Sequence, residues 1–340
     1  MLLSLSAASV FAQSSLIATL SHEGEITAFY GANALKEAHE AAAHGDAITL
    51  SSGTFNATDI TKAVTLRGAG MQVDTVNNVL PTIVSGDFIV EITDEVDNKL
   101  TMEGIYHNAT MTLKGTLTDA RFIKNRFSTI SAKAYNNGYL VNSIFLHCKI
   151  VAKFTYTQND SDIQFSNCYI KSLNRLNSNS GTSHILLANC IIKTDENNAF
   201  HWYCNVSLNN CLLEGVNKSN LVCDRTPVAV STVNAYNNVA VNCHNNECFS
   251  GFTNTTNSYS TYTEFFKDYT GTYNDDITFE LTDEAKAKFL GTDDTQVGIY
   301  GGNFPYDPTT TNPHITKCNV AAKSTADGKL SVDIEVAGVE

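Results

Sequence analysis

Short segments in which apolar and polar residues alternate recur along the middle of the chain. In residues 163–170, 185–192 and 206–213 the apolar positions fall two apart, slip by one residue, and then fall two apart again. Alternation over four to eight residues is typical of a β-strand. The slip requires a bend, because the second half of the apolar set would otherwise point outward. Each segment therefore predicts two short strands joined by a bend.

The bend position in all three segments is an asparagine followed by a cysteine, at Asn167, Asn189 and Asn210. The same frame extends upstream with looser matches, and its successive bend positions are 20 to 22 residues apart: 104, 125, 147, 167, 189 and 210. A repeat of this length is one supersecondary unit that cannot bury its apolar face alone, so the units must stack. The sequence therefore predicts a parallel β-solenoid.

Asparagine suits the bend because it tolerates the left-handed backbone region, as glycine does at Gly104. Stacked bends place side-chain amides at the spacing of neighbouring strands, about 4.8 Å. An amide both donates and accepts hydrogen bonds. We therefore expect the asparagine row to satisfy its own hydrogen bonds.

The region before the repeats predicts a cap for the open end of the solenoid. Residues 34–43 have the pattern of an amphipathic helix, and strand-like runs follow at 45–55 and 64–68. An uncovered solenoid end is a sheet edge that could pair with another chain, so a helix there has a physical purpose.

Together, the capping helix, the bend asparagines and the short coils resemble the right-handed parallel β-helix of the pectin-lyase-like superfamily. The resemblance covers roughly residues 31 to 245, and the run 291–306 resembles the C-terminal end of exported β-helical proteins from gut Bacteroidetes. It implies an all-β, single-stranded right-handed parallel β-helix with an N-terminal capping helix. It also implies a bacterial source.

The chain divides into three parts on this interpretation. Residues 1–12 are interpreted as the remnant of a signal peptide, because an apolar run ends in a small-x-Ala pattern. Residues 13–245 hold the capping helix and the coil. Residues 246–340 are expected to form an irregular cap with a short helix near 281–289 and a β-hairpin over 314–338.

Composition excludes some partners. The chain carries 22 basic and 35 acidic residues, a net charge of −13, which argues against nucleic acid or an anionic membrane as the partner. No apolar stretch reaches the length of about 18 residues that a membrane span needs. The protein is expected to be secreted, or to lie at the cell surface or in the periplasm.

The cysteines predict an interior row and no metal site. Of nine cysteines, four occupy the same repeat position: Cys148, Cys168, Cys190 and Cys211. Such a row is expected to be buried, small and free. A straight row offers no tetrahedral set of ligands, and strand spacing fits poorly with the shorter Cβ separation of a disulfide.

Chemistry could lie on a polar strip three residues beyond the cysteine row. Lys171, Lys193 and Glu214 occupy that position, with Arg175 and Asp195 nearby. Lyases of this fold use an arginine or lysine base with calcium-binding carboxylates, and its hydrolases use two or three carboxylates. The alternative is a solvated strip of compensating charge pairs. That alternative is favoured, because no dense carboxylate cluster accompanies the strip.

Aromatic residues suggest a second candidate site. Tyr135, Tyr156 and the run His201, Trp202 and Tyr203 precede the cysteine row by similar intervals. On one face they could stack on sugar rings. The alternative is that they point inward or pack in loops.

Two function classes follow. The first is an exported or cell-surface protein that binds carbohydrate without catalysis, and the missing catalytic clusters favour it. The second is a polysaccharide lyase or glycoside hydrolase that acts on an acidic glycan, which rests on fold analogy alone. No cofactor is expected, apart from calcium for a lyase. The sequence leaves the glycan and the oligomeric state open.

Overall fold

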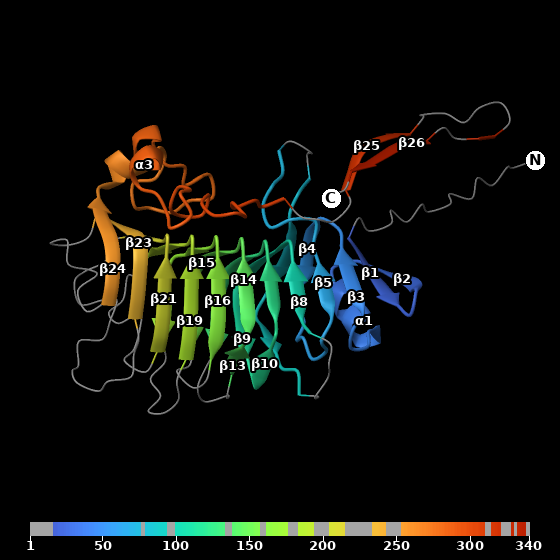
Figure 1. Cartoon of the computed structure of the whole chain (residues 1–340). Helices are drawn as coiled ribbons and strands as arrows, with labels where there is room; N and C mark the ends of the chain where they lie inside the picture. Colours follow the sequence, from blue (N-terminus) through green and yellow to red (C-terminus); the bar gives the residue numbers. More distant parts are fainter. Residues whose placement is uncertain are drawn as a thin grey trace, which may run out of the picture.

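The computed structural model is an all-β parallel solenoid of about seven turns, with 51% of the described residues in strands and 8% in helices (Figure 1). This confirms the predicted parallel β-helix. The residues that the structure describes are 16–75, 79–93, 99–132, 138–156, 161–175, 183–193, 204–214, 233–242, 253–309, 314–320, 328–329 and 332–337.

The first sheet of the solenoid stacks the strands that precede each bend, and consecutive members pair in parallel. They are β3 (Ala47–Leu50), β5 (Thr65–Arg67), β8 (Thr101–Glu103), β11 (Arg121–Ile123), β14 (Ser143–Leu146), β16 (Asp162–Ser166), β19 (Ser183–Ala188), β21 (Cys204–Asn209) and β23 (Val233–Val241). A further parallel strand, β24 (Thr253–Ser260), pairs with β23. Residues 253–260 were expected to belong to the irregular part of the cap, and in the structure they instead form a strand of the coil.

The second sheet stacks the strands that follow each bend. They are β4 (Gly53–Asn56), β6 (Thr82–Ser85), β9 (Ile105–Leu113), β12 (Arg126–Ala132), β15 (Lys149–Tyr156), β17 (Tyr169–Ile170), β20 (Ile191–Lys193) and β22 (Leu212–Glu214). The far halves of the longer strands pair with β7 (Phe88–Val90) and β18 (Leu173–Arg175). A separate two-stranded parallel sheet joins β10 (Thr116–Thr118) and β13 (Tyr139–Val141).

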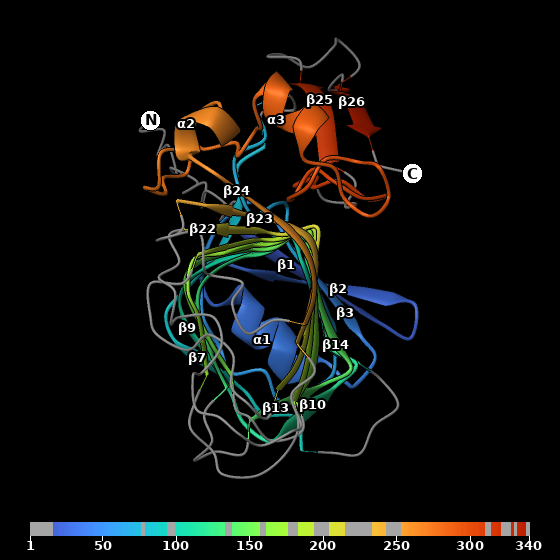
Figure 2. The same ribbon diagram turned by 60° about the vertical axis from the view of Figure 1, so that its left-hand side comes forward.

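The N-terminal end of the coil is closed as predicted. Helix α1 (Ala34–Ala41) lies across the open end of the solenoid (Figure 2) and buries Ala34, Leu35 and Ala38 against the core. Before it, β1 (Ile17–His22) pairs antiparallel with both β2 (Glu25–Tyr30) and β3. These two strands extend the first sheet beyond the helix cap.

The interior is filled by residues that stack from one turn to the next. Phe122, Phe145 and Phe165 are fully buried, and their rings stack with centroids 4.6 Å and 4.9 Å apart. Parallel in-register strands place like residues above one another, so a repeat in the sequence becomes a column in the core.

The bends adopt the left-handed backbone that the sequence predicted. Asn167, Asn189 and Asn210 have φ of 51°, 51° and 56°, and further bends lie at Gly104, Lys124, His147 and Asn237. One position was assigned wrongly, because the bend after β11 falls on Lys124 and Asn125 lies one residue beyond it. Asn125 instead occupies the cysteine position of its turn and is fully buried.

The buried column behind the bends is a hydrogen-bonded ladder. The Sγ atoms of Cys148 and Cys211 lie 3.2 Å and 3.3 Å from backbone carbonyls of the preceding turn, at Phe122 and Leu187. Asparagines flank the cysteines on both sides of the same column. Asn125 accepts from the N–H of Ile105 at 3.0 Å, and Asn238 accepts from the N–H of Cys211 at 2.8 Å. The four cysteines are buried and free, which confirms the predicted row.

Burial predicts how these thiols react. Burial raises the pKa of Cys168, Cys190 and Cys211 well above the ordinary range, so little thiolate forms near neutral pH. We expect a thiol reagent to label them very slowly in the folded protein and to label at least four thiols after unfolding. Titration in the presence and absence of denaturant measures both values, and fewer than four thiols after unfolding would contradict the free ladder.

The bend side chains do not satisfy one another as expected, because they bind the C-terminal segment instead. Asn167 Nδ2 donates to the carbonyls of Ile299 and Gly301, both at 2.8 Å, and Asn210 Oδ1 accepts from the N–H of Thr292 at 2.9 Å. Residues 289–309, which we call the strap, thus lie along the bend column, as the orange chain above the strands in Figure 1 shows.

The strap continues along the earlier bends. His147 Nε2 donates to the carbonyl of Phe304 at 3.0 Å, and Lys124 Nζ binds Asp307 Oδ2 at 3.0 Å. Gly302 has φ of 80°, and a Cβ there would lie 2.5 Å from Asn189 Nδ2, so this close approach requires glycine. The side chains at the bends, most of them asparagines, therefore form the surface on which the strap packs.

The remaining C-terminal elements agree with the sequence. Helix α3 (Asp283–Lys288) has the predicted N-cap, because Thr282 Oγ1 accepts from the N–H of Ala285 at 3.1 Å. A four-residue helix, α2 (Tyr262–Phe265), precedes it, and β25 (His314–Val320) and β26 (Val332–Ala337) form the expected antiparallel hairpin. Within the described part of the chain, no helix has the length and apolar character of a membrane span.

Candidate functional site

The predicted catalytic strip lies partly beneath the C-terminal region. Lys193 Nζ and Glu214 Oε1 form an ion pair of 3.3 Å, and the Glu214 side chain is only 1% exposed. Glu214 also accepts hydrogen bonds from the hydroxyls of Tyr262, at 2.8 Å, and Tyr269. Burial raises the pKa of Glu214. The strip therefore brings Lys193 and Glu214 together, and both side chains are engaged in contacts within the protein.

The other members of that strip are distributed differently. Lys171 is half-buried next to β17, and Arg175 is the last residue of β18. Asp195 falls outside the described residues.

The predicted aromatic row loses its one described member. Tyr156 ends β15 and is fully buried in the core of the coil, so its ring presents no face to solvent. Residues 133–137 and 194–203, which include Tyr135, His201, Trp202 and Tyr203, fall outside the described residues. The alternation pattern alone could not show which way Tyr156 points.

Apart from the predicted strip, a cluster of two cationic side chains, Lys149 and Arg126, lies between the second sheet and the strap. Lys149 is only 6% exposed, its Nζ donates to Gln72 Oε1 at 3.3 Å, and burial lowers its pKa to about 8. Its Nζ also lies 5.6 Å from the ring centre of Tyr306, and the neighbouring Arg126 pairs with Asp275 at 2.7 Å. Because Lys149 is buried and the cluster is paired with the C-terminal region, it holds that region on the coil.

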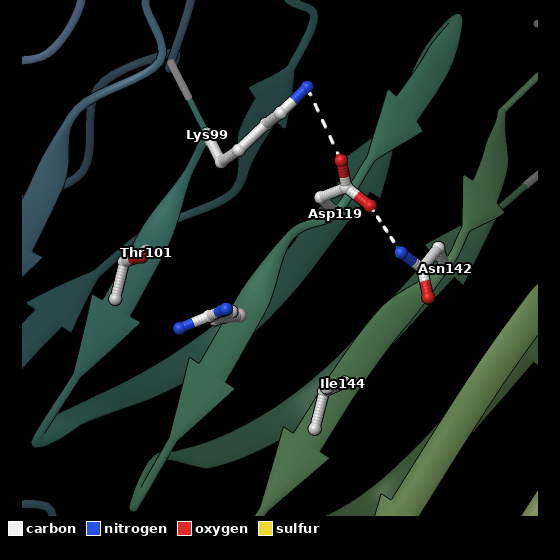
Figure 3. Close-up of a pocket in the computed structure, with 6 residues that line it drawn as sticks. Lys99, Thr101, Asp119, Asn142 and Ile144 are labelled. Carbon is white, nitrogen blue, oxygen red and sulfur yellow. Dashed lines mark hydrogen bonds and ion pairs between the residues drawn. The ribbon is translucent and has the colours of Figure 1, made fainter. Parts of the chain in front are cut away.

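An open hollow lies on the outer face of the first sheet, over β8, β11 and β14 (Figure 3). Its volume is about 340 Å³, near the lower end of the usual range for small-molecule sites. Six residues line it: Lys99, Thr101, Asp119, Arg121, Asn142 and Ile144. None of them was a candidate from the sequence.

Strand register arranges these six residues as a grid. Arg121 pairs with Thr101 on one side and with Ile144 on the other, which forms one row across three strands. Lys99, Asp119 and Asn142 each lie two residues earlier and form the second row. The residues between the two rows, Leu100, Ala120 and Ser143, are buried, so both rows project outward.

The second row is held together by its own contacts. Lys99 Nζ lies 3.3 Å from Asp119 Oδ2, and Asn142 Nδ2 donates to Asp119 Oδ1 at 2.5 Å, as the dashed lines in Figure 3 show. The hydrogen bond from Asn142, followed by that from Lys99, lowers the pKa of Asp119. The carboxylate therefore stays ionised at neutral pH and holds both neighbours in place.

Arg121 contributes the free charge of the hollow. Its side chain is exposed, and among the described residues it has no ion pair or hydrogen-bond partner. Arginine offers five N–H donors in a planar fork and stays charged at any physiological pH. The hollow thus presents an unused donor group beside a fixed carboxylate and amide, with an apolar contact from Ile144.

Local backbone geometry explains why Asp119 and Asn142 point into the hollow. Both have positive φ, 55° and 49°, at a second bend where the sheet of β10 and β13 meets the first sheet. Aspartate and asparagine tolerate this conformation better than most residues. The signal in the sequence was this pair at matching positions of consecutive turns, five residues before the bends at Lys124 and His147.

The described residues give no cluster that suits a metal ion. No group of three or more histidine, cysteine, aspartate or glutamate side chains gathers within the part of the chain that the structure describes. A single carboxylate, Asp119, lines the hollow. Calcium usually takes six to eight oxygen ligands, so the residues present there do not suit it.

The chain was compared with protein-family models, with curated proteins and with solved structures, and none of the three comparisons found a match.

Proposed function

We propose that this chain is an exported or cell-surface bacterial β-helix protein that binds carbohydrate, without cleaving it, in the hollow over β8, β11 and β14. The proposal includes the finer placement in the pectin-lyase-like superfamily and among exported proteins of Bacteroidetes. The capping helix, the bend asparagines and the run 291–306 support that placement.

The observation that carries the proposal is the grid of polar groups on a rigid, solvent-facing sheet. Sugars present hydroxyls as both donors and acceptors, and the grid offers a carboxylate, an amide, a hydroxyl and two cations within three adjacent strands. Parallel pairing on both sides of β11 fixes the backbone under these groups, so little ordering cost arises when a ligand binds.

The same geometry supports binding over hydrolysis. Glycoside hydrolases of the usual kind need two carboxyl groups about 5 to 10 Å apart. Among the six residues that line the hollow, Asp119 is the single carboxylate, and Lys99 and Asn142 already bind it. The alternative, a polysaccharide lyase acting on an acidic glycan, draws support from Arg121, since lyases of this fold use an arginine or lysine as the base.

The Arg121→Ala change tests the proposed site. We expect it to weaken the affinity for the glycan about tenfold to hundredfold, because a hydrogen bond to a charged group contributes roughly 1.5–3 kcal/mol. The measurement is affinity electrophoresis of the purified protein through gels that contain each member of a polysaccharide panel.

Gln164→Ala is the matched control, since Gln164 lies on the same outer face as the register neighbour of Ile144 and does not line the hollow. Equal loss in both variants would show a diffuse surface effect. Unchanged retention in Arg121→Ala would count against the hollow as the binding site.

A further inference from the structure

Strand β2 is the outermost strand at the N-terminal end of the first sheet (Figure 1). It pairs with β1 along its full length, and among the described residues no other strand pairs with it. Natural proteins usually protect such an edge with proline, lysine, a bulge or a short strand. β2 has six residues, Glu25–Tyr30, continuous register, and neither proline nor lysine.

The hydrogen-bond pattern shows which groups of β2 face outward. The N–H of Gly31 donates to the carbonyl of Leu16 at 2.9 Å, directly beyond the β1–β2 register. In an antiparallel pair the bonded positions alternate. Ile26, Ala28 and Tyr30 therefore direct their N–H and C=O groups toward the free edge.

The side chains of the outward-directed residues are apolar and exposed. Ile26 is 75% exposed and Tyr30 is 47% exposed, although both are large. On the opposite face, Phe29 packs against the core and anchors the strand. The edge thus combines an exposed apolar surface with backbone groups that have no strand partner among the described residues.

A second copy of β2 fits this edge in one preferred register. When two copies of β2 pair antiparallel, residues that direct their backbone groups outward must lie opposite each other. If Ala28 of one copy lies opposite Ala28 of the other, all three such residues, Ile26, Ala28 and Tyr30, are matched. Ile26 then lies opposite Tyr30 of the second copy, and Glu25 lies opposite Gly31, so no like charges meet. This arrangement forms roughly six backbone hydrogen bonds and brings the exposed side chains of Ile26 and Tyr30 into cross-strand contact.

We propose that the protein forms a two-fold symmetric dimer in which the β2 strands of two copies pair antiparallel about Ala28 and join their first sheets into one. A two-fold interface is self-complementary, as this register is. The axis is perpendicular to the joined sheet, so the two hollows lie on the same side, roughly 50 Å apart at 4.8 Å per strand. Two sites on one face would strengthen binding to a polymer, a consequence that rests on the proposed function.

Charge substitutions at the axis test the proposal. Ala28→Lys and Ala28→Glu each place like charges on two residues whose Cα atoms lie about 5.5 Å apart across the axis. We expect the full-length wild-type protein to sediment as a dimer and each variant alone as a monomer with an unchanged circular dichroism spectrum. An equimolar mixture of the two variants is expected to sediment as a dimer again.

Ala188→Lys is the control, because it adds the same charge to the outer face of the same sheet at β19, far from the edge, and it should stay dimeric. A monomeric wild type would overturn the proposal, as would variants that both stay dimeric or a mixture that stays monomeric. If a monomeric wild type dimerised after deletion of residues 1–15, the chain's own N-terminal segment would be the occupant of this edge, and the proposal would also fail.

Discussion

Replacing Phe145 by alanine is expected to lower the free energy of unfolding by about 3–5 kcal/mol, the usual loss for a buried phenylalanine. Phe145 is fully buried at the centre of the column of stacked rings. Its ring lies between Phe122 and Phe165 and meets Phe154 edge-on at 5.5 Å. The change would therefore leave a cavity lined by three aromatic rings.

Denaturant unfolding followed by circular dichroism measures this loss. Phe304→Ala is the control, because Phe304 is 74% exposed and its removal should change the free energy of unfolding by less than about 0.5 kcal/mol. Similar small losses in both variants would mean that the ring column is not the centre of the folded core.

Glu214→Ala is expected to lower the free energy of unfolding by a comparable amount, about 3–5 kcal/mol, because it removes one partner of a buried ion pair. The side chain of Glu214 is 1% exposed and accepts from Tyr262, Tyr269 and Lys193. Removing it takes a shared carboxylate acceptor away from two hydroxyls and one ammonium group beneath the C-terminal region, although Lys193 keeps its bond to the carbonyl of Gly271. Thermal unfolding and protease sensitivity of the chain after residue 260 would report this loss.

Glu264→Ala is the matched control, because among the described residues its exposed carboxylate accepts only a 3.5 Å hydrogen bond from Ser260 Oγ. The pH dependence gives a second readout. Burial raises the pKa of Glu214 in the folded state, so the stability it contributes is greatest below its unfolded pKa and falls as pH rises through the folded value. Wild type should therefore lose stability relative to Glu214→Gln as pH rises through that window. A difference that stays constant with pH would contradict the burial of an ionisable Glu214.

Periodicity explains what the sequence could predict. The frames of Asn167, Asn189 and Asn210 repeat closely, so strand, bend and buried cysteine follow from one argument. The bend at Lys124 was missed because lysine rarely adopts positive φ and an asparagine stands next to it. The cysteine position of that turn is filled by Asn125, which makes the same kind of bond to the preceding turn.

Contacts between distant segments explain what the sequence could not predict. The bond from Asn167 to Ile299 joins residues 132 positions apart, and no repeat links the strap to the coil. The hollow likewise depends on Lys99, Asp119 and Asn142 meeting across three turns. In the sequence each of them has the character of an ordinary turn or surface residue, and only the strand register shows that they lie side by side.

The most direct measurement is to incubate the purified protein, with and without calcium, with a panel of acidic and neutral polysaccharides. Retention of protein on each polysaccharide and the chain length of the polysaccharide after incubation are both recorded, with Arg121→Ala measured in parallel. We predict that at least one polysaccharide retains the wild-type protein and that the chains of this polysaccharide stay intact. We also predict that the Arg121→Ala variant is no longer retained. Shortened chains would replace binding with catalysis, and no retention across the panel would contradict the proposed function.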